Sequence, residues 1–539
     1  MADGGETADA VRGGDSEPPR SAPLSDGKPD NAPAPDGAGA RAWLYRVVAA
    51  NAGARSVSSA NAALVDRFIS ATESATALML WFGENASSLA GDRSHLRAAL
   101  LRDLAELDEA MTRLANAILH HPRFQRLEAL WRGVELVVDA ADEADVVNVR
   151  VLDVRWGEIA RDLERAVEFD QSSLFQKIYS EEFGMPGGTP YGVLVVDHEL
   201  QHKPRPGRAA DDLSTVTGLA QIAQASFAPV ILGASPPLFG LETFREFGLP
   251  IDLRAVFRGN EYGRYKRFRQ SEEARFVGLT VPRVLLRLPW SRQRSVATGF
   301  PYSEDRFGRP VSGHLWGNAG FAFATILIRA FIQYRWFADI RGVQRDQTGG
   351  GLVTDLPTTW FDTEAPRSAL KYSVDVALTD RVEKDLDDLG FISLRNCKDT
   401  PYSVFYGSQS VHTESPTGNE VARANERLST MLRYTLCVSR FAHYLKVMVR
   451  DRIGSFTTAE EIENDLHRWL MNYTIGNDDA DLETKARYPL REAQCQVRDM
   501  PGRPGSYRCI IHLKPHFQLD DVVSSFRLVT EMTSLAGRQ

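Results

Sequence analysis

Cysteine is scarce in this chain of 539 residues, which has only Cys397, Cys437, Cys495 and Cys509. No two of them form a Cys-x-x-Cys pair, so the spacing of zinc ribbons and thioredoxin-like redox sites is absent. So few cysteines in so long a chain favour a reducing compartment. Cys495 and Cys509 are predicted to lie opposite each other on a hairpin near the C-terminus, where we expect two reduced thiols.

Long apolar runs are absent as well. The most apolar stretch runs from Gly317 to Ile328 and is followed by Arg329, so it is too short to cross about 30 Å of hydrocarbon. The first 20 residues hold five acidic side chains and two arginines, which is the opposite of a secretory signal. We therefore expect a cytoplasmic protein without membrane insertion.

An excess of basic residues is also missing. The chain holds 63 basic and 71 acidic side chains, a formal net charge of −8. A general nucleic-acid binder needs a basic surface, so we expect no nucleic-acid partner. The composition is otherwise ordinary for a globular protein, with 43% hydrophobic and 25% charged residues. The length suggests about two to four domains.

Phosphate-binding and nucleophile motifs are lacking too. The only Gly-Lys pair is Gly27-Lys28, and Pro29 follows it, so there is no Walker A loop. Neither G-x-G-x-x-G nor G-x-S-x-G occurs. These absences exclude the common nucleotide-binding and serine-hydrolase signatures.

One catalytic motif matches by letter. The run His198-Glu199-Leu200-Gln201-His202 is H-E-x-x-H, which holds zinc in metalloproteases when it lies on a helix. Here it directly follows an apolar run, residues 192–196, that predicts a strand, and two prolines come just after it. We favour a polar strand-to-helix loop and keep a zinc metallohydrolase as the minor alternative. We accordingly predict no catalytic, cofactor-binding or metal-ligating residue and no enzymatic activity.

The N-terminal region differs in composition from the rest. Residues 1–40 contain six prolines, seven glycines and no aromatic residue, which predicts a disordered tail because too little apolar surface is available for burial. Residues 41–94 are expected to form an N-terminal helical segment.

Two helices with a one-sided apolar pattern come next. In the first, over about residues 96–121, the apolar positions are spaced alternately four and three residues apart: Leu100, Leu104, Leu107, Met111, Leu114 and Ile118. Pro122 begins the second, which carries Phe124, Leu127, Trp131, Val134 and Val138. Packing of both helices on a core or on each other is the simpler interpretation. A surface for a partner helix is the alternative.

Strand signals begin at residue 146, where Val147, Val149 and Val151 alternate with other residues. A strand, a helix and a second strand are predicted at 192–196, 212–226 and 229–232, a rhythm typical of an α/β layer. We predict an α/β (mixed α+β) multi-domain fold, with mixed sheets flanked by helices, divided into domains at 95–390 and 391–539.

The last part of the chain has its own pattern. A long apolar-striped helix ends near Gly454, and Thr458 with Glu461 forms a capping box for the next helix. A strand pair follows at about 493–498 and 506–513. A final alternating stretch at 522–529 is predicted to be an edge strand that a neighbouring chain completes.

The run from His120 to Gly133, HHPRFQRLEALWRG, makes the sequence resemble a known family. Similar runs follow in order: YGVL at 191–194, FGLE at 239–242, RFVGLTVPR at 275–283, LWGN at 315–318, RFAHY at 440–444, IGSF at 453–456, ARYPLREA at 486–493 and KPHF at 514–517. Together they resemble the TssC/VipB family, the large subunit of the type VI secretion contractile sheath, over about residues 95–530.

This resemblance implies a structural role and a set of partners. Family members pair with a small sheath subunit of the TssB/VipA type, stack around the Hcp inner tube and contract. Neighbouring sheath protomers exchange β-strands, a baseplate is a further partner, and a ClpV-type AAA+ ATPase disassembles the contracted sheath. A sheath-like subunit of another contractile injection system is the alternative within this class. The expected partner-interface residues are Leu100, Leu104, Leu107, Met111, Leu114, Val522, Ser524 and Phe526.

Overall fold

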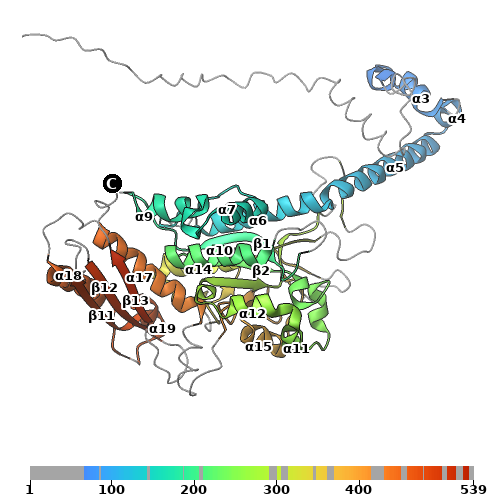
Figure 1. The fold of residues 1–539 in the computed structure, drawn as a ribbon. Coiled ribbons are helices and arrows are strands. Elements are labelled where there is room, and N and C mark those ends of the chain that lie inside the picture. The colour runs from blue at the N-terminus through green and yellow to red at the C-terminus, as the bar shows by residue number, and fades with distance from the viewer. Residues whose placement is uncertain are drawn as a thin grey trace, which may run out of the picture. The chain divides into compact units, whose positions relative to one another are not determined.

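The computed structural model describes residues 66–83, 86–141, 146–185, 187–204, 211–290, 300, 302–304, 314–343, 348–360, 370–413, 430–450, 458–477, 479–499, 507–516 and 526–532. The chain divides into two compact units, one up to Asn116 and one from Ala117 onward, and each is described by itself (Figure 1). The expected disordered tail at 1–40 and residues 41–65 of the expected helical segment lie outside the described residues.

The first unit is helical where it is described. It contains α3 (Ser74–Phe82), α4 (Ala86–Ala90) and most of the 27-residue helix α5 (Arg93–Leu119). The Nε1 of Trp81 donates a hydrogen bond of 2.7 Å to Oδ2 of Asp103, which ties α3 to α5. Helix α5 confirms the long helix that the leucine spacing predicted over about residues 96–121.

A six-stranded mixed sheet forms the centre of the second unit. Its strands are β1 (Leu194–Leu200), β2 (Val230–Ala234), β3 (Val277–Val281), β9 (Phe391–Asn396), β10 (Ser403–Phe405) and β6 (Leu352–Val353), in the order β1-β2-β3-β9-β10-β6. The first four are parallel, and β10 is antiparallel to both of its neighbours. This confirms the mixed sheet that the sequence predicted.

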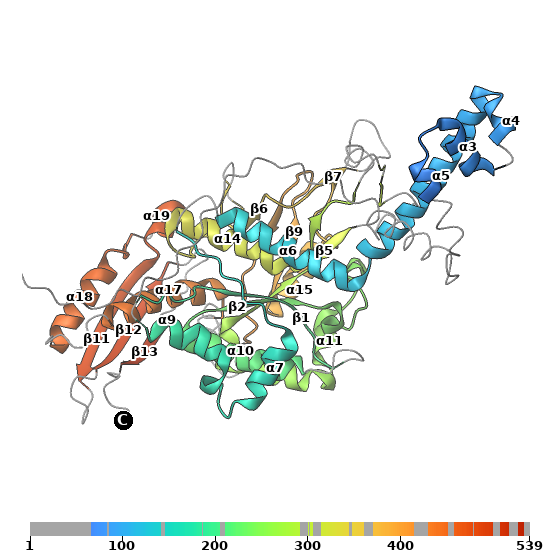
Figure 2. The same cartoon turned by 90° about the horizontal axis from the view of Figure 1, so that it is seen from above.

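Helices cover both faces of this sheet (Figure 2). On one face lies α10 (Asp212–Ser226), and on the other α14 (Ala319–Tyr334). Strand β2 shows why, since Val230 and Leu232 belong to the cluster with α10 whereas Ile231 belongs to the cluster with α14. Successive side chains of a strand point to opposite faces, so an uninterrupted apolar strand requires cover on both sides.

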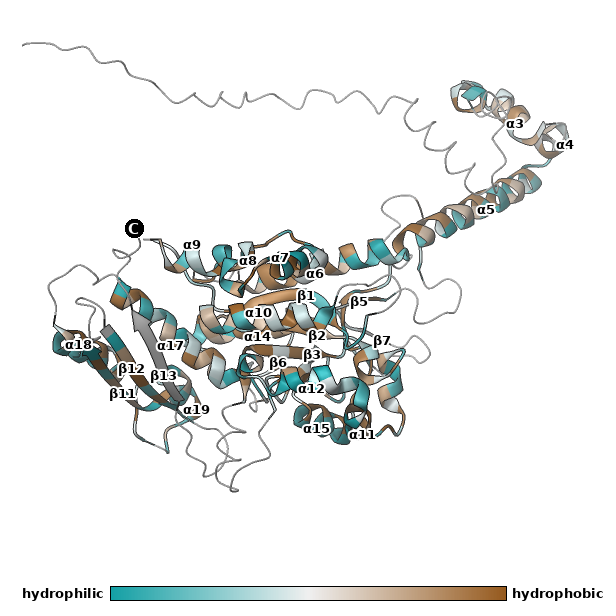
Figure 3. Cartoon of the chain, viewed as in Figure 1, coloured by the Kyte–Doolittle hydropathy of each residue, from teal (hydrophilic) through white to brown (hydrophobic). Residues whose placement is uncertain are grey.

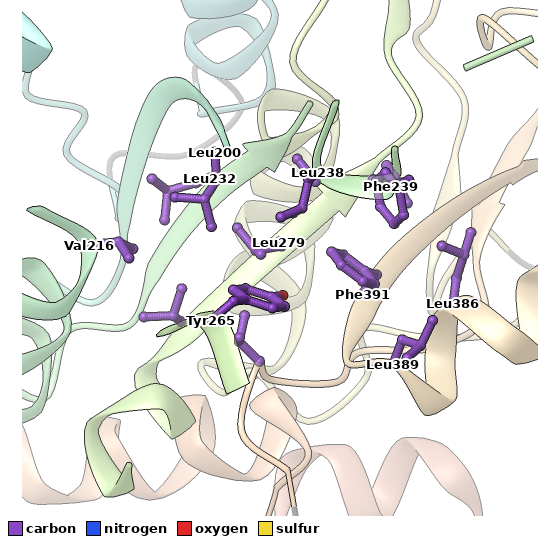
Figure 4. Close-up of a cluster of buried hydrophobic side chains, with 14 of the residues drawn as sticks. Leu200, Val216, Leu232, Leu238, Phe239, Tyr265, Leu279, Leu386, Leu389 and Phe391 are labelled. Atoms are coloured by element: carbon purple, nitrogen blue, oxygen red, sulfur yellow. The ribbon is translucent and has the colours of Figure 1, made fainter. Parts of the chain in front are cut away.

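The larger cluster is rich in aromatic residues (Figure 4). Phe239 and Phe391 lie with ring centroids 4.7 Å apart, in the same cluster as Leu232 of β2 and Leu279 of β3. Tyr265 belongs to the same cluster and is 1% exposed. This core fixes the strand ends and the loops that follow them.

The C-terminal part forms a separate layer. Its sheet has the order β11-β12-β13, with β11 at Leu490–Asp499, β12 at Tyr507–Pro515 and β13 at Phe526–Met532, all antiparallel. The helices α17 (Leu432–Arg450) and α18 (Ala459–Met471) pack with it, and Thr458 with Glu461 forms the predicted capping box.

The remaining elements of the second unit are shorter or peripheral. They are α6 (Pro122–Ala141), α7 (Trp156–Arg165), α8 (Ser173–Phe175), α9 (Glu181–Phe183), α11 (Leu253–Arg258), α12 (Gly263–Arg269), β4 (Val284–Arg287), β5 (Leu315–Gly317), β7 (Thr359–Trp360), β8 (Leu370–Lys371), α15 (Asp380–Asp388) and α19 (Leu482–Arg487). The predicted domain division at residue 390 stays a prediction. Strand β9, which begins at Phe391, pairs with β3 in the central sheet.

One predicted strand is not formed. Residues 147–155, where Val147, Val149 and Val151 alternate with other residues, are assigned neither strand, helix nor turn. The expectation of a strand is therefore wrong for the single chain, because no described strand lies alongside to pair with this segment.

Candidate interaction surfaces

The apolar stripe of α5 is mostly exposed in the described part of the chain. Leu100, Leu104 and Leu107 keep 36%, 54% and 40% of their surface accessible, and Met111 and Leu114 are half-buried. Figure 3 shows hydrophobic and hydrophilic residues interspersed along this helix. These side chains therefore do not form a buried core within the described part of the first unit. Its assignment to a partner interface stays a prediction.

Helix α6 has an apolar face that points away from its own core. Phe124, Leu127, Trp131 and Val138 are 37%, 53%, 59% and 44% exposed, and we call these four residues the α6 stripe. They are spaced three, four and seven residues apart, so they share one side of the helix. Exposed apolar side chains in such a row are typical of a docking surface. The sequence pattern revealed this row, but only the structure shows which side is exposed.

The buried side of α6 is made of small residues. Ala129, Gly133 and Ala141 are buried within the second unit, and a Cβ atom on Gly133 would lie 2.3 Å from Cδ2 of Phe321 on α14. The two helices approach so closely because α6 offers no bulky side chain here. Because the small residues occupy the buried side, the larger apolar residues of α6 lie on its exposed side.

A buried ionic network fixes α6 to strand β4. The Arg287 guanidinium, 8% exposed, donates from Nε to Glu128 of α6 over 2.6 Å and from both terminal nitrogens to Glu304 over 2.8 and 3.0 Å. The backbone N–H of Trp290 also donates to Glu304, over 2.6 Å. Breaking such a network leaves a buried charge without compensation, so it holds α6 in place.

The H-E-x-x-H motif lies on a strand rather than on a helix. Strand β1 runs to Leu200, so the expected strand-to-helix loop is wrong for His198, Glu199 and Leu200. His198 stacks on Trp156 at 3.8 Å and shares a 3.0 Å hydrogen bond with Asp212. Glu199 instead accepts two hydrogen bonds, of 2.5 and 2.6 Å, from the Arg283 guanidinium.

This arrangement does not fit a zinc protease site. Two histidines at i and i+4 meet at one metal only on a helix, whereas His202 here stacks on Tyr262 with ring centroids 4.3 Å apart. No group of three His, Cys, Asp or Glu side chains among the described residues is placed to hold a metal ion.

The C-terminal sheet contains the remaining predicted interface residues. Phe526 is the first residue of β13, opposite Leu513 of β12, whereas Val522 and Ser524 lie outside the described residues. Strand β13 is at one edge of the three-stranded sheet and pairs on its other side with β12 of the same chain. Whether another chain completes that edge stays a prediction.

The two cysteines of this sheet are neighbours. Cys495 lies opposite Ile511 and Cys509 opposite Val497, so the pair is diagonal across the strands and the expectation of directly opposite cysteines is wrong. Their sulfur atoms are 3.5 Å apart, and both cysteines are free.

An open groove of about 760 Å³ lies between α7, α10 and α12, and the sequence did not reveal it. Apolar side chains such as Leu163 and Phe268 line it together with three glutamates and two arginines, so its charges nearly balance. Val167 at its rim is 88% exposed.

In the described ranges, no helix is long and apolar enough to span a membrane.

Two family models match the sequence in succession. Residues 102–412 match the tail sheath N-terminal domain of the EvpB/VC_A0108 (VipB) family, and residues 421–532 match its tail sheath gpW/gp25-like domain.

Individual proteins are similar as well. The type VI secretion system sheath protein TssC1 of Pseudomonas aeruginosa is 36% identical over 434 residues, which cover 80% of this chain and 85% of that protein. A cryo-EM structure of the anti-feeding prophage baseplate aligns with a TM-score of 0.30 and 10% identity over 60% of this chain and 66% of that chain.

Proposed function

The chain belongs to the VipB tail sheath family as a type VI secretion sheath large subunit, and from this we propose that it assembles with a small sheath subunit around an Hcp tube and contracts to propel that tube. The match to both successive sheath domains is the observation that carries the proposal. The family is one of structural sheath proteins. Such a protein acts through the surfaces by which it contacts other chains.

The exposed apolar faces support the assembly step. The α5 stripe and the α6 stripe present large apolar side chains that the described parts of their own units leave accessible. Burial of one such side chain is worth about 1.5–3 kcal/mol, so a partner that covers several gains substantial affinity. We assign both stripes to the small sheath subunit.

Contraction requires subunits that stay linked while rigid bodies move. Main-chain pairing between protomers tolerates such movement because the ladder remains closed while the linkers bend. Strand β13, at a sheet edge, is the element that we assign to the contact with a neighbouring protomer. Baseplate contact and release by a ClpV-type ATPase complete the proposed cycle, which we place in the cytoplasm.

Co-expression tests this proposal. The full chain is produced with the small sheath subunit of the same secretion system, purified through a tag on the small subunit, and viewed by electron microscopy. We expect a one-to-one complex that forms tubes. A large subunit that purifies as a monomer and never co-purifies would contradict the proposal.

A further inference from the structure

Two thiols meet on the buried face of the C-terminal sheet. Cys495 of β11 and Cys509 of β12 have their Sγ atoms 3.5 Å apart. The two residues are 7% and 1% exposed and belong to the apolar cluster that this sheet shares with α17 and α18. Side chains two residues apart in a strand share one face, and both cysteines follow the buried positions of their strands. Their sulfur atoms therefore contact each other inside the packed layer.

The separation of the two sulfur atoms is small enough for a bond to form with little movement. A disulfide places its sulfur atoms about 2.05 Å apart, so the pair has to close by about 1.5 Å. Strands β11 and β12 are already paired from Glu492 to Asp499, so the chain entropy of bringing the two residues together has been lost on folding. Oxidation would add one covalent bond to a contact that already exists.

The two thiols differ in acidity because they share one hydrogen bond. That hydrogen bond, followed by burial, raises the pKa of Cys495. The same hydrogen bond lowers the pKa of Cys509. The thiolate is the nucleophilic form of cysteine, so Cys509 is the thiol that reacts first with an oxidant. Cys495 lies in contact with it and is positioned to react with the product.

We propose that Cys495 and Cys509 form a redox modification site, at which a peroxide converts the two thiols into a disulfide that joins β11 to β12. The Cys509 thiolate attacks one oxygen of hydrogen peroxide and the O–O bond breaks, which yields a sulfenic acid and, after protonation, one water molecule. The sulfur of Cys495 then attacks the sulfenic sulfur, the S–O bond breaks and a second water molecule leaves. In sum, two thiols and one hydrogen peroxide give one disulfide and two water molecules.

The disulfide would cross-link the hairpin on which the C-terminal sheet is built. Strand β12 is the central strand of this sheet and pairs with both β11 and β13. A bond between β11 and β12 constrains the unfolded chain more than the folded one, so it stabilises the sheet. In a reducing compartment the thiols stay free, and the cross-link forms only when peroxide is present.

Peroxide treatment of the folded full chain tests the site. The reduced chain is exposed to hydrogen peroxide, quenched with a thiol-alkylating reagent in denaturant, digested and analysed by mass spectrometry. We expect a linked peptide with Cys495 and Cys509 from chains that run as monomers on a non-reducing gel. Cys437 of the same cluster is the matched control, since it is 3% exposed and has no second thiol beside it among the described residues, and it should stay a thiol. Equal loss of all three thiols, or a linked peptide that appears only after denaturation, overturns the proposal.

Glu463 of α18 offers a second signature. Its carboxylate accepts a 2.8 Å hydrogen bond from the backbone N–H of Val497. Besides the shared hydrogen bond and burial, its negative charge acts to raise the pKa of both thiols. Glu463→Gln keeps an oxygen acceptor for that N–H and removes the charge, so disulfide formation should be about threefold faster or more. Glu460→Gln, at an exposed position of the same helix, is the control and should leave the rate unchanged. An unchanged rate for Glu463→Gln would contradict the ionisation step.

Unfolding measures the cross-link itself. The peroxide-treated chain should require more denaturant to unfold than the reduced chain, and dithiothreitol should reverse this shift. Cys495→Ala should abolish the shift, whereas Cys437→Ala, which truncates another buried cysteine, should retain it. If Cys495→Ala fails to fold, the reversal by dithiothreitol in the unchanged chain decides alone. A disulfide that forms without any change in unfolding would overturn the stabilising cross-link. These experiments need no small sheath subunit, so their outcome is separate from that of the proposed function.

Discussion

Gly133 of α6 lies against the ring of Phe321 of α14 so closely that an added Cβ would be 2.3 Å from Cδ2 and 2.5 Å from Cε2. Phe321 is 5% exposed and has little room to withdraw. The contact decides which side of α6 is buried. The large apolar side chains of the α6 stripe are exposed because this small side takes the buried position.

Gly133→Ala should destabilise the second unit by about 1–2 kcal/mol. Alanine improves helix propensity by about 1 kcal/mol, but overpacking a core costs about 1–3 kcal/mol, and the immobile ring favours the upper value. Thermal or denaturant melts measure the change. Gly157→Ala on α7 is the control, since nothing lies within 4 Å of the added atom, and it should be neutral or stabilising. Adding Phe321→Leu to Gly133→Ala should recover part of the loss. Equal stability of the two glycine variants would contradict the close contact.

Leu107→Asp should weaken the heterodimer with the small sheath subunit by tenfold or more. The substitution removes an apolar contact worth about 1.5–3 kcal/mol and buries a charge, and about 1.4 kcal/mol corresponds to tenfold in affinity. Ala105→Asp places the same charge on the same helix away from the stripe and is the matched control. Titration of the small subunit against both variants measures the effect. Unchanged affinity for Leu107→Asp would mean that the stripe is not an interface.

Deletion of residues 521–539 should leave the heterodimer and abolish long tubes. The deletion removes β13, which we assign to the contact between protomers, whereas the helices assigned to the small subunit lie near the other end of the sequence. Electron microscopy of the co-expressed proteins gives the tube length. Tubes of normal length from the truncated chain would count against strand exchange. Loss of the heterodimer itself would mean that β13, which pairs with β12, is needed for the fold of the subunit.

The stability of the second unit should fall with acidification in part because of His443. Burial lowers the pKa of His443 to about 3, while in the unfolded chain it is about 6.5. Between these values the unfolded state takes up a proton that the folded state does not, so stability is present above about pH 6.5 and is lost toward pH 3. One such group contributes a slope of about 1.4 kcal/mol per pH unit.

His443→Gln tests this assignment. The Nε2 of His443 lies 2.9 Å from the carbonyl oxygen of Ser226, and a glutamine amide retains a donor without the titration. Denaturant unfolding between pH 7 and 4 should show a shallower pH dependence for the variant. His467 on α18 is exposed, and His467→Gln is the control that should keep the original slope. Identical slopes for His443→Gln and the unchanged chain would contradict the assignment.

Zinc should not bind through His198 and His202. The two rings have different neighbours, since one stacks on Trp156 and the other on Tyr262. Elemental analysis of the purified chain should give far less than one zinc per chain, and replacement of both histidines by alanine should leave assembly with the small subunit intact. Stoichiometric zinc that disappears on this replacement would reverse the conclusion.

Local sequence patterns were sufficient for the longer helices and for several of the strands. The leucine spacing predicted α5, the Thr458–Glu461 box predicted the start of α18, and the apolar run at 229–232 predicted β2. Such signals depend on residues close in sequence, and a helix or a doubly covered strand requires a particular apolar period wherever it packs. The family resemblance was likewise contained in short runs that can be compared without a structure.

The orientation of these elements was decided only by the tertiary structure. The pattern of α6 predicted one apolar side, yet the close approach of Gly133 to Phe321 buries the small side and exposes the large residues. The motif at 198–202 satisfied a zinc signature by letter, but the parallel pairing of β1 with β2 makes its first three residues strand. The valines at 147–151 have a strand pattern that the single chain leaves unpaired. A residue pattern specifies a period and a polarity, whereas the surface that satisfies it belongs to residues distant in sequence or to another chain.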